Sequence, residues 1–385
     1  MLIQQPPLKD AVCKVIIVDM LSVRRINKEG FAMNENTYND YYSPLDLQPT
    51  PPVPDFDRAS ARKVFSRIGF ALAVYIIGSF LFPSLLVLLA YELDMVLDGT
   101  IEWFYKYYSP VAFVTSAFLG FVFFHLVAGK LPRDSRIAHY SLEKGDMLKA
   151  GCASISGVYV GGLIATLLMT AVNAFLPTPL EDPLVNMVGT TEPWGLFVTV
   201  CILAPVIEEL LFRKLLLDRL SVFGDRTAIF VGSLCFALYH CNIYQFFYAM
   251  LLGMVFSWVY LRSGKILLTM TLHAIINFMG GIITPYFQEQ LGVFSGDLES
   301  AMTVANVEIE NLLPAMLASI YSLAMVGIAI TGIVLVCWKW KTLFFAPANN
   351  PIPKGRGFST AILNPGMITF VVITLLLVIY QFVAL

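Results

Sequence analysis

Two neighbouring glutamates and an arginine lie inside a long apolar stretch, APVIEELLFRKLLL. Charged side chains are rare inside membrane segments, because burying one there is costly unless a partner compensates the charge. Residues four positions apart share one face of a helix, so Glu209 is predicted to pair with Arg213. Glu208 is rotated by about 100° from its neighbour and is left free for chemistry. Pro205 is expected to kink this helix and to admit water or substrate beside the carboxylate.

Two further apolar stretches carry polar side chains at helical spacing. In FALYH, Phe236 lies one turn before His240. In HAIIN, His273 and Asn277 are four residues apart, so the imidazole and the carboxamide project from one helical face. A carboxylate, two imidazoles and a carboxamide are suited to hydrolysis, since one group takes a proton from water and neutral donors stabilise the developing oxyanion.

The same acidic and imidazole groups are also potential metal ligands. If a metal such as zinc is present, its expected ligands are Glu208, His240 and His273, and its bound water becomes the nucleophile. The helical HExxH signature is absent, because Ala274 follows His273. The preferred interpretation therefore assigns no metal and requires no cofactor, with zinc as the alternative.

The composition is that of a membrane protein, since 57% of the 385 residues are hydrophobic, 14% are charged and the mean hydropathy is +0.73. A helix needs about 20 apolar residues to cross the hydrocarbon core of a bilayer. The sequence predicts an all-α polytopic integral membrane protein with about nine spans. They are expected at residues 68–93, 107–129, 151–176, 194–217, 227–241, 243–261, 265–284, 313–338 and 366–385.

Basic residues determine the predicted orientation. With nine spans, every one of the 25 Lys and Arg residues except Lys106 falls on the same side. Because cytoplasmic loops retain positive charge, the N-terminus is predicted to be cytoplasmic. Helical rise places Glu208 and His273 roughly 9–14 Å from that side but His240 nearer 20 Å. Either the fifth helix begins deeper in the membrane than the predicted start at residue 227 implies, or the cavity that holds these side chains is tall enough to span the difference in depth.

Four parts are predicted along the chain. Residues 1–57 contain prolines but no long apolar run, and are expected to form a flexible cytoplasmic tail, for which both Met1 and Met33 fit as the first residue. The other three parts are N-terminal transmembrane helices at 58–189, a catalytic core at 190–285 and C-terminal transmembrane helices at 286–385.

Together the three motifs resemble those of the CPBP family of intramembrane proteases. This family includes the CAAX prenyl endopeptidases of the Rce1 type, bacteriocin-processing and immunity proteins, and lysostaphin-resistance-like proteins. EELLFR matches the pattern EExxxR, FALYH matches FxxxH and HAIIN matches HxxxN, in this order and inside predicted spans. The resemblance covers residues 190–285, and every polar position of the three patterns is filled.

The resemblance implies a catalytic role for four residues. Glu208 would be the general base, His240 would help to position the attacking water, and His273 with Asn277 would polarise the scissile carbonyl. Three further residues would support the site: Glu209, Arg213 and Phe236.

The resemblance further implies an integral, multi-pass endopeptidase, located in the plasma membrane if the cell is prokaryotic. Its mechanism would depend on the glutamate or on a metal. The expected partners are the lipid bilayer and a membrane-tethered peptide, and no nucleic acid is expected. The peptide would carry a CAAX-type lipidated C-terminus or a leader or bacteriocin-like sequence.

Other functions are compatible with the same residues. A non-catalytic membrane adaptor or immunity protein of the same family would tolerate Glu208→Gln, whereas a protease would not. Transport is less favoured, because the two halves of the chain show no corresponding pair of broken helices. Simple cross-linking of helices by polar side chains is a further alternative, but it does not explain three motifs in order.

Overall fold

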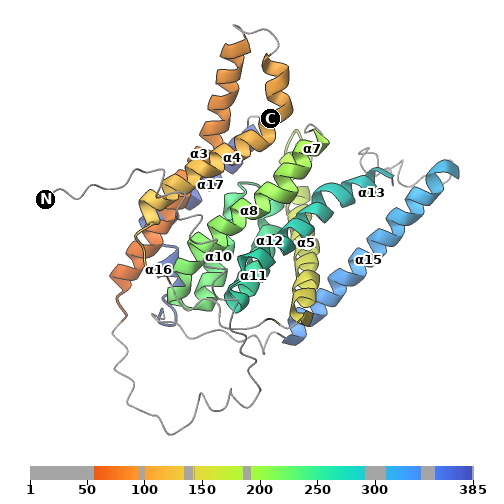
Figure 1. The fold of residues 1–385 in the computed structure, drawn as a ribbon. Coiled ribbons are helices and arrows are strands. Elements are labelled where there is room, and N and C mark those ends of the chain that lie inside the picture. The colour runs from red at the N-terminus through yellow and green to blue at the C-terminus, as the bar shows by residue number, and fades with distance from the viewer. Residues whose placement is uncertain are drawn as a thin grey trace, which may run out of the picture. The chain divides into compact units, whose positions relative to one another are not determined.

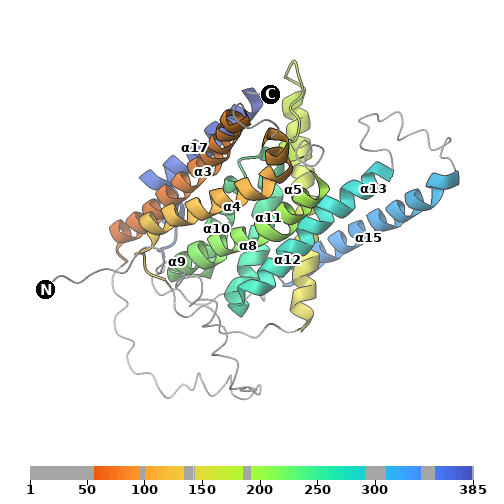
Figure 2. The ribbon, with the colours of Figure 1, turned by 45° about the horizontal axis from the view of Figure 1, so that its top comes forward.

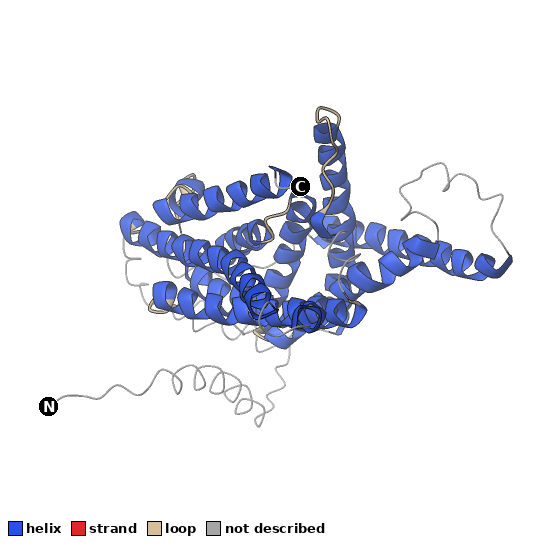
Figure 3. Cartoon of the chain, turned by 90° about the horizontal axis from the view of Figure 1, so that it is seen from above, coloured by secondary structure: helices blue, strands red, loops and turns tan. Residues whose placement is uncertain are grey.

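The structure is a computed structural model in which every regular element is a helix, and no strand occurs in the described residues (Figure 3). This confirms the predicted all-α class. The predicted tail, residues 1–57, lies almost wholly outside the described residues, and the division of 58–385 into three parts stays a prediction. The described residues are 56–94, 100–133, 142, 144–184, 192–290, 309–339 and 352–383.

Most of the described residues lie in helices (Figure 1). The longest are α3 (Arg58–Asp94), α4 (Thr100–Ala128), α5 (Lys144–Asn173), α11 (Ile243–Ser263) and α15 (Ile309–Lys339). The shorter ones are α10 (Asp225–Tyr239), α16 (Gly357–Ala361) and α17 (Pro365–Val383). One helical segment continues through α12 (Ile266–Phe278), η5 (Met279–Ile283) and α13 (Thr284–Gln290). Another comprises α7 (Pro193–Leu196), η2 (Phe197–Leu203), α8 (Ala204–Glu209), η3 (Leu210–Leu217), α9 (Asp218–Leu220) and η4 (Ser221–Phe223).

Seven of these segments are long and apolar enough to cross a membrane. Their outward faces are also apolar: Leu88, Leu167 and Leu323 are 61%, 63% and 74% exposed. Such faces suit lipid rather than water, and the protein is a polytopic integral membrane protein. Helix α10 has only 15 residues, and the apolar part of α17 is also short. The count of nine spans and the cytoplasmic N-terminus therefore stay predictions.

The start of α3 shows local capping chemistry. Oδ1 of Asp57 accepts the backbone N–H groups of Ala59 and Ser60, and Oδ2 accepts the Ser60 hydroxyl. These bonds satisfy donors that have no partner within the first helical turn. The hydrogen bonds from Ser60 also hold the pKa of Asp57 below its ordinary value. This cap starts α3 ten residues before the predicted span.

Helix α3 packs along α4 and also against α17, which is distant in the sequence (Figure 2). The contact with α17 is close, because a Cβ atom on Gly366 would lie 1.7 Å from the carbonyl oxygen of Ser66. The Gly366 N–H donates to the Ser66 hydroxyl at 2.9 Å. Helix α5 contacts both α11 and α15, and α11 contacts α10. Helix α11 therefore packs against both α5 and α10.

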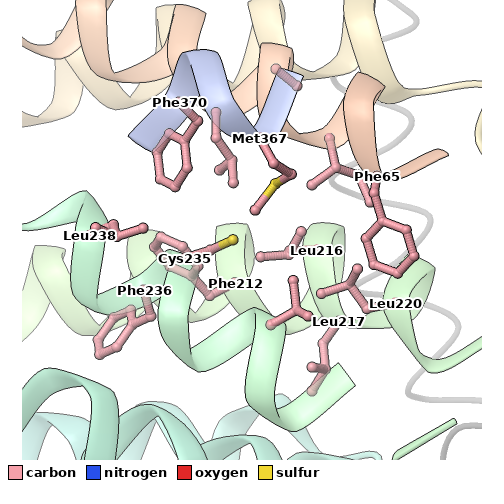
Figure 4. Packing of buried hydrophobic residues seen from close by; sticks show 14 of the residues in the cluster. Phe65, Phe212, Leu216, Leu217, Leu220, Cys235, Phe236, Leu238, Met367 and Phe370 are labelled. Carbon is pink, nitrogen blue, oxygen red and sulfur yellow. The ribbon is translucent and has the colours of Figure 1, made fainter. Parts of the chain in front are cut away.

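The main hydrophobic cluster joins α17 to the helices that carry the polar motifs. Figure 4 shows Met367 and Phe370 of α17 directed toward Leu216 of η3 and Cys235 of α10. All four side chains are fully buried. Interiors packed in this way deform little, so the last helix supports the region in which the polar residues meet.

Candidate active site

Glu208 and Glu209 end the short helix α8, between two π-helical stretches. Pro205 lies in the first turn of α8 and has no N–H to donate. The hydrogen-bond pattern changes here, since the preceding Ala204 N–H still bonds the carbonyl of Thr199, five residues back. Stretches of π-helix interrupt the regular ladder and are frequent at functional sites. The helix changes type at Pro205, while the kink predicted there stays a prediction.

Glu209 and Arg213 form the predicted ion pair, and both side chains are fully buried. Nε of Arg213 lies 2.9 Å from Oε2 of Glu209, and Nη2 lies 3.3 Å from Oε1. The guanidinium carbon lies 5.1 Å and 5.7 Å from the ring centroids of Phe236 and Phe256. Two hydrogen bonds and two aromatic faces compensate for the loss of water around the charges.

Glu208 points away from this pair and toward two imidazole rings. Its Oε2 lies 4.0 Å from Nε2 of His240 and 3.8 Å from Nε2 of His273. Both distances are longer than a hydrogen bond, and this oxygen is buried without a hydrogen-bond partner among the described residues. A buried polar atom of this kind indicates catalysis or an ordered water. A water bound here would contact the carboxylate and the imidazoles.

His240 follows the last residue of α10, and its orientation is set by Phe236. Nδ1 lies 2.8 Å from the carbonyl oxygen of Phe236. A carbonyl only accepts hydrogen bonds, so Nδ1 carries the hydrogen, and in the neutral ring Nε2 is the acceptor that faces Glu208. The two rings meet edge-on with centroids 4.9 Å apart. Cys241 has a φ of 50°, a left-handed conformation that ends the helix directly after His240.

His273 contacts both glutamates. Its Nδ1 lies 3.1 Å from Oε1 of Glu209, while Nε2 faces Glu208. A carboxylate bound to one ring nitrogen fixes the orientation of an imidazole and the position of its hydrogen, as in hydrolase triads. Glu209 therefore binds His273 as well as Arg213. The sequence analysis missed this contact, because the two residues are 64 positions apart and no local spacing reports it.

Glu208 and His240 meet because the fourth helical segment is longer than predicted. It continues to Phe223, six residues beyond the expected end, and Gly224 alone separates it from α10. Glu208 precedes Phe223 by 15 positions and His240 follows Asp225 by 15 positions, which is about 20 Å of helix in both cases. The predicted difference in depth was wrong, and the misplaced end of the fourth span caused it.

Asn277 lies one turn after His273 and connects α12 to η2. Its Nδ2 donates to the carbonyl oxygen of Val200 at 2.9 Å. The side chain is only partly buried, and an amide nitrogen carries two hydrogens. One hydrogen is thus used to hold the neighbouring segment, and the other is available for a further acceptor. The geometry gives Asn277 a structural contact that its spacing from His273 did not predict.

The three potential metal ligands, Glu208, His240 and His273, lie near one another but are more widely spaced than in a zinc site. In a tetrahedral site with bonds of about 2.0–2.1 Å, neighbouring ligand atoms lie about 3.4 Å apart. The Glu208 oxygen lies 3.8 Å and 4.0 Å from the two imidazole nitrogens. No group of three or more His, Cys, Asp or Glu side chains in the described ranges is placed to hold a metal ion. The two distances are 0.4–0.6 Å longer than this spacing, and the metal-free site stays a prediction.

Comparison with known proteins gives one match. Residues 190–279 match the family model described as type II CAAX prenyl endopeptidase Rce1-like. The matched region contains all three polar motifs and extends from the residues before α7 to the start of η5. Searches of curated proteins and of solved structures yield no match.

Proposed function

We propose that this protein is an intramembrane endopeptidase, because residues 190–279 match the model of the type II CAAX prenyl endopeptidase Rce1-like family, which is a protease family. It hydrolyses a peptide bond of a membrane-tethered substrate. The observation that carries the proposal is the buried Oε2 of Glu208, with two imidazole nitrogens within 4.0 Å and no hydrogen-bond partner among the described residues.

Glu208 acts as the general base in this proposal. A water donates one hydrogen to Oε2 of Glu208 and the other to Nε2 of His240, which orients the water. Its oxygen attacks the scissile carbonyl carbon as Glu208 takes the proton. The carbon–nitrogen bond then breaks, and the leaving amine receives that proton from Glu208. Atoms and charges balance without another reactant.

The oxyanion that forms during attack needs hydrogen-bond donors. His273 meets this need if Nε2 carries a hydrogen in addition to the one that Nδ1 donates to Glu209. This form of the ring is positively charged. It offsets the negative charge of Glu208, whereas Arg213 offsets that of Glu209. Asn277 supplies its second amide hydrogen. Supporting this assignment, Phe236 and Phe256 pack against the His273 ring, with centroids 5.9 Å and 5.2 Å away.

The family match favours a C-terminal CAAX sequence that carries a lipid as the substrate. The helices that carry the site also expose apolar side chains, among them Val206 and Ile275 at 39% and 49%, so a substrate anchored in the bilayer reaches these helices by lateral diffusion. A farnesylated, internally quenched CAAX peptide in proteoliposomes tests this substrate class. A leader or bacteriocin-like peptide is the alternative if the farnesylated peptide is not cleaved while new termini appear in cells.

The first experiment is quantitative mapping of protein termini in cells. Three cell lines are compared: one lacks the protein, one expresses wild type and one expresses Glu208→Gln at the same membrane level. Termini that appear only with wild type are expected, and they identify candidate substrates. Identical profiles in all three lines would reject proteolysis, and a retained deletion phenotype would then favour a non-catalytic adaptor.

A metal-free mechanism is part of the proposal and has its own test. Cleavage by the purified protein should persist in a strong chelator, and the distances of 3.8 Å and 4.0 Å from the Glu208 oxygen to the two imidazole nitrogens, longer than the roughly 3.4 Å of a zinc site, support this expectation. Activity that disappears with the chelator and returns with zinc would overturn this part of the mechanism while leaving the endopeptidase assignment intact.

A further inference from the structure

His240 lies in a short turn that its own helix holds only weakly. Residues 240–242 alone connect α10 to α11. The backbone N–H of His240 reaches the carbonyl oxygen of Ala237 at 3.4 Å, which is long for a hydrogen bond of this kind. Cys241 follows with a φ of 50°, a left-handed conformation that is strained for a residue other than glycine and persists only where its surroundings fix it. The turn therefore needs contacts from outside α10.

Asn242 supplies such contacts with both ends of its carboxamide. The residue is buried, at 7% exposure, and its backbone is extended directly before α11 begins. Its Oδ1 accepts the backbone N–H of Tyr244 at 2.9 Å and so caps α11. Its Nδ2 donates to Oδ1 of Asp182 at 3.0 Å. The turn that carries His240 is thus bound to a residue 60 positions before Asn242 in the chain.

Asp182 belongs to the connection between α5 and α7, outside the region that matches the protease family. Its Oδ1 also accepts the backbone N–H of Leu184 at 3.0 Å. Leu180 is fixed as well, since its carbonyl oxygen accepts the Tyr244 hydroxyl at 2.7 Å and its N–H donates to Oδ1 of Asn173 at 3.0 Å. The connection is therefore anchored to both α5 and α11, and it presents the carboxylate as a fixed acceptor.

We propose that Asp182 is a positioning residue for His240 and acts through Asn242, an inference that rests on the proposed endopeptidase function. In that function one water bonds both Oε2 of Glu208 and Nε2 of His240, atoms that lie 4.0 Å apart. The bond from Nδ1 of His240 to the Phe236 carbonyl sets the orientation of the ring, while the turn sets its position. The Asp182–Asn242 hydrogen bond keeps that position, and a displacement of about 1 Å is enough to lower a rate about 100-fold.

Two substitutions test whether this hydrogen bond holds the turn. Asp182→Ala removes the acceptor without adding a charge. Asn242→Asp keeps an oxygen for the Tyr244 N–H but sets a second carboxylate against Asp182, and the two like charges repel. Adding Asp182→Asn to Asn242→Asp exchanges donor and acceptor. The double variant restores the bond, because the new carboxamide donates to the new carboxylate.

Tyr244→Phe is the matched control. It removes the hydroxyl that bonds the Leu180 carbonyl and leaves the Asp182–Asn242 bond in place. The Leu180 carbonyl keeps a donor, Nδ2 of Asn173 at 3.3 Å. If the connection only stabilised the fold, Tyr244→Phe and Asp182→Ala would leave the rate of the folded protein unchanged. Positioning of His240 instead predicts a loss of rate for Asp182→Ala and none for Tyr244→Phe.

The experiment compares these variants with wild type and Glu208→Gln at equal membrane levels. The first quantity is the initial rate at which Glu208-dependent protein termini form in cells after induction, divided by the amount of folded protein found by gel filtration. The second is the rate at which N-ethylmaleimide modifies Cys241, which is 1% exposed, in each purified protein. Asp182→Ala and Asn242→Asp are expected to lower the first rate about 10- to 100-fold and to raise the second. The double variant should return both rates toward those of wild type, and Tyr244→Phe should change neither.

Three results would overturn the inference and leave the proposed function intact, provided that Glu208→Gln is inactive. One is Asp182→Ala with the cleavage rate or the Cys241 labelling of wild type. Another is a double variant no faster than Asn242→Asp alone. The third is an equal loss of rate in Tyr244→Phe, which would assign the effect to the whole connection rather than to its bond with the turn. If no termini depend on Glu208, the proposed function fails and the inference with it, whatever the labelling of Cys241.

Discussion

Two adjacent carboxylates of one helix have opposite surroundings. Glu209 is fully buried and binds both Arg213 and His273. Glu208 is 7% exposed, and its Oε2 has no hydrogen-bond partner among the described residues. A carboxylate with all its partners in place has little capacity to accept another hydrogen, whereas an unpartnered one can take a proton from water. The two residues are adjacent in the sequence and their side chains are about 100° apart around the helix. This rotation directs Glu209 to its structural partners and Glu208 to the proposed catalytic site.

Glu208→Gln is expected to have the largest effect of any substitution. The amide keeps the shape of the side chain but cannot act as a base, so the cleavage rate should fall by roughly 1,000-fold or more. The free energy of unfolding should change little, because Oε2 has no hydrogen bond to lose in the described structure. The appearance of new protein termini and the thermal midpoint measure the two quantities. Retained turnover would contradict the assignment of Glu208.

Glu209→Gln should act mainly on stability. Removing this charge leaves Arg213 buried without its counter-charge, and broken buried pairs cost about 3–5 kcal/mol. Titration of the purified protein with SDS in mixed micelles measures the free energy of unfolding. A fully stable but inactive variant would show that Glu209, through His273, is more important for the reaction than for the fold.

Arg213→Lys should have a smaller effect of the same kind. Lysine keeps the positive charge but cannot bind both carboxylate oxygens in the same planar arrangement. We expect a loss of about 1.5–3 kcal/mol in the free energy of unfolding, the range for one hydrogen bond to a charged group. The same SDS titration tests this. A loss equal to that of Glu209→Gln would mean that geometry matters as much as charge.

Among the substitutions around the Glu209–Arg213 pair, Ser257→Ala should have the smallest effect on the free energy of unfolding. Its hydroxyl accepts from Nη1 of Arg213 at a long 3.4 Å, so its removal should lower the free energy of unfolding by less than about 1 kcal/mol. Ser233→Ala is the matched control, because Ser233 is buried and its hydroxyl has no partner among the described residues. A large loss for Ser257→Ala alone would show that Arg213 depends on this contact.

Sequence reasoning succeeded where the relevant contact lies within one helix. The Glu209–Arg213 pair and the placement of Phe236 next to His240 both follow from four-residue spacing. It failed at the end of the fourth segment, because the chain remains helical through Asp218 and Arg219 and turns only at Gly224, whose φ is 98°. Apolar composition does not report such an end, since polar residues can continue a helix.

The sequence by itself determined the membrane class, the helical fold and the set of polar residues within the spans, because composition and periodicity are local properties. Tertiary structure alone decided that Oε2 of Glu208 faces two imidazoles, that Glu209 also binds His273 and that Asn277 bonds the main chain of η2. It also packed Tyr75 of α3 against Tyr239, the residue that precedes His240. These contacts join helices that are far apart in the chain, and their distances depend on how the helices pack, which no spacing along the sequence encodes.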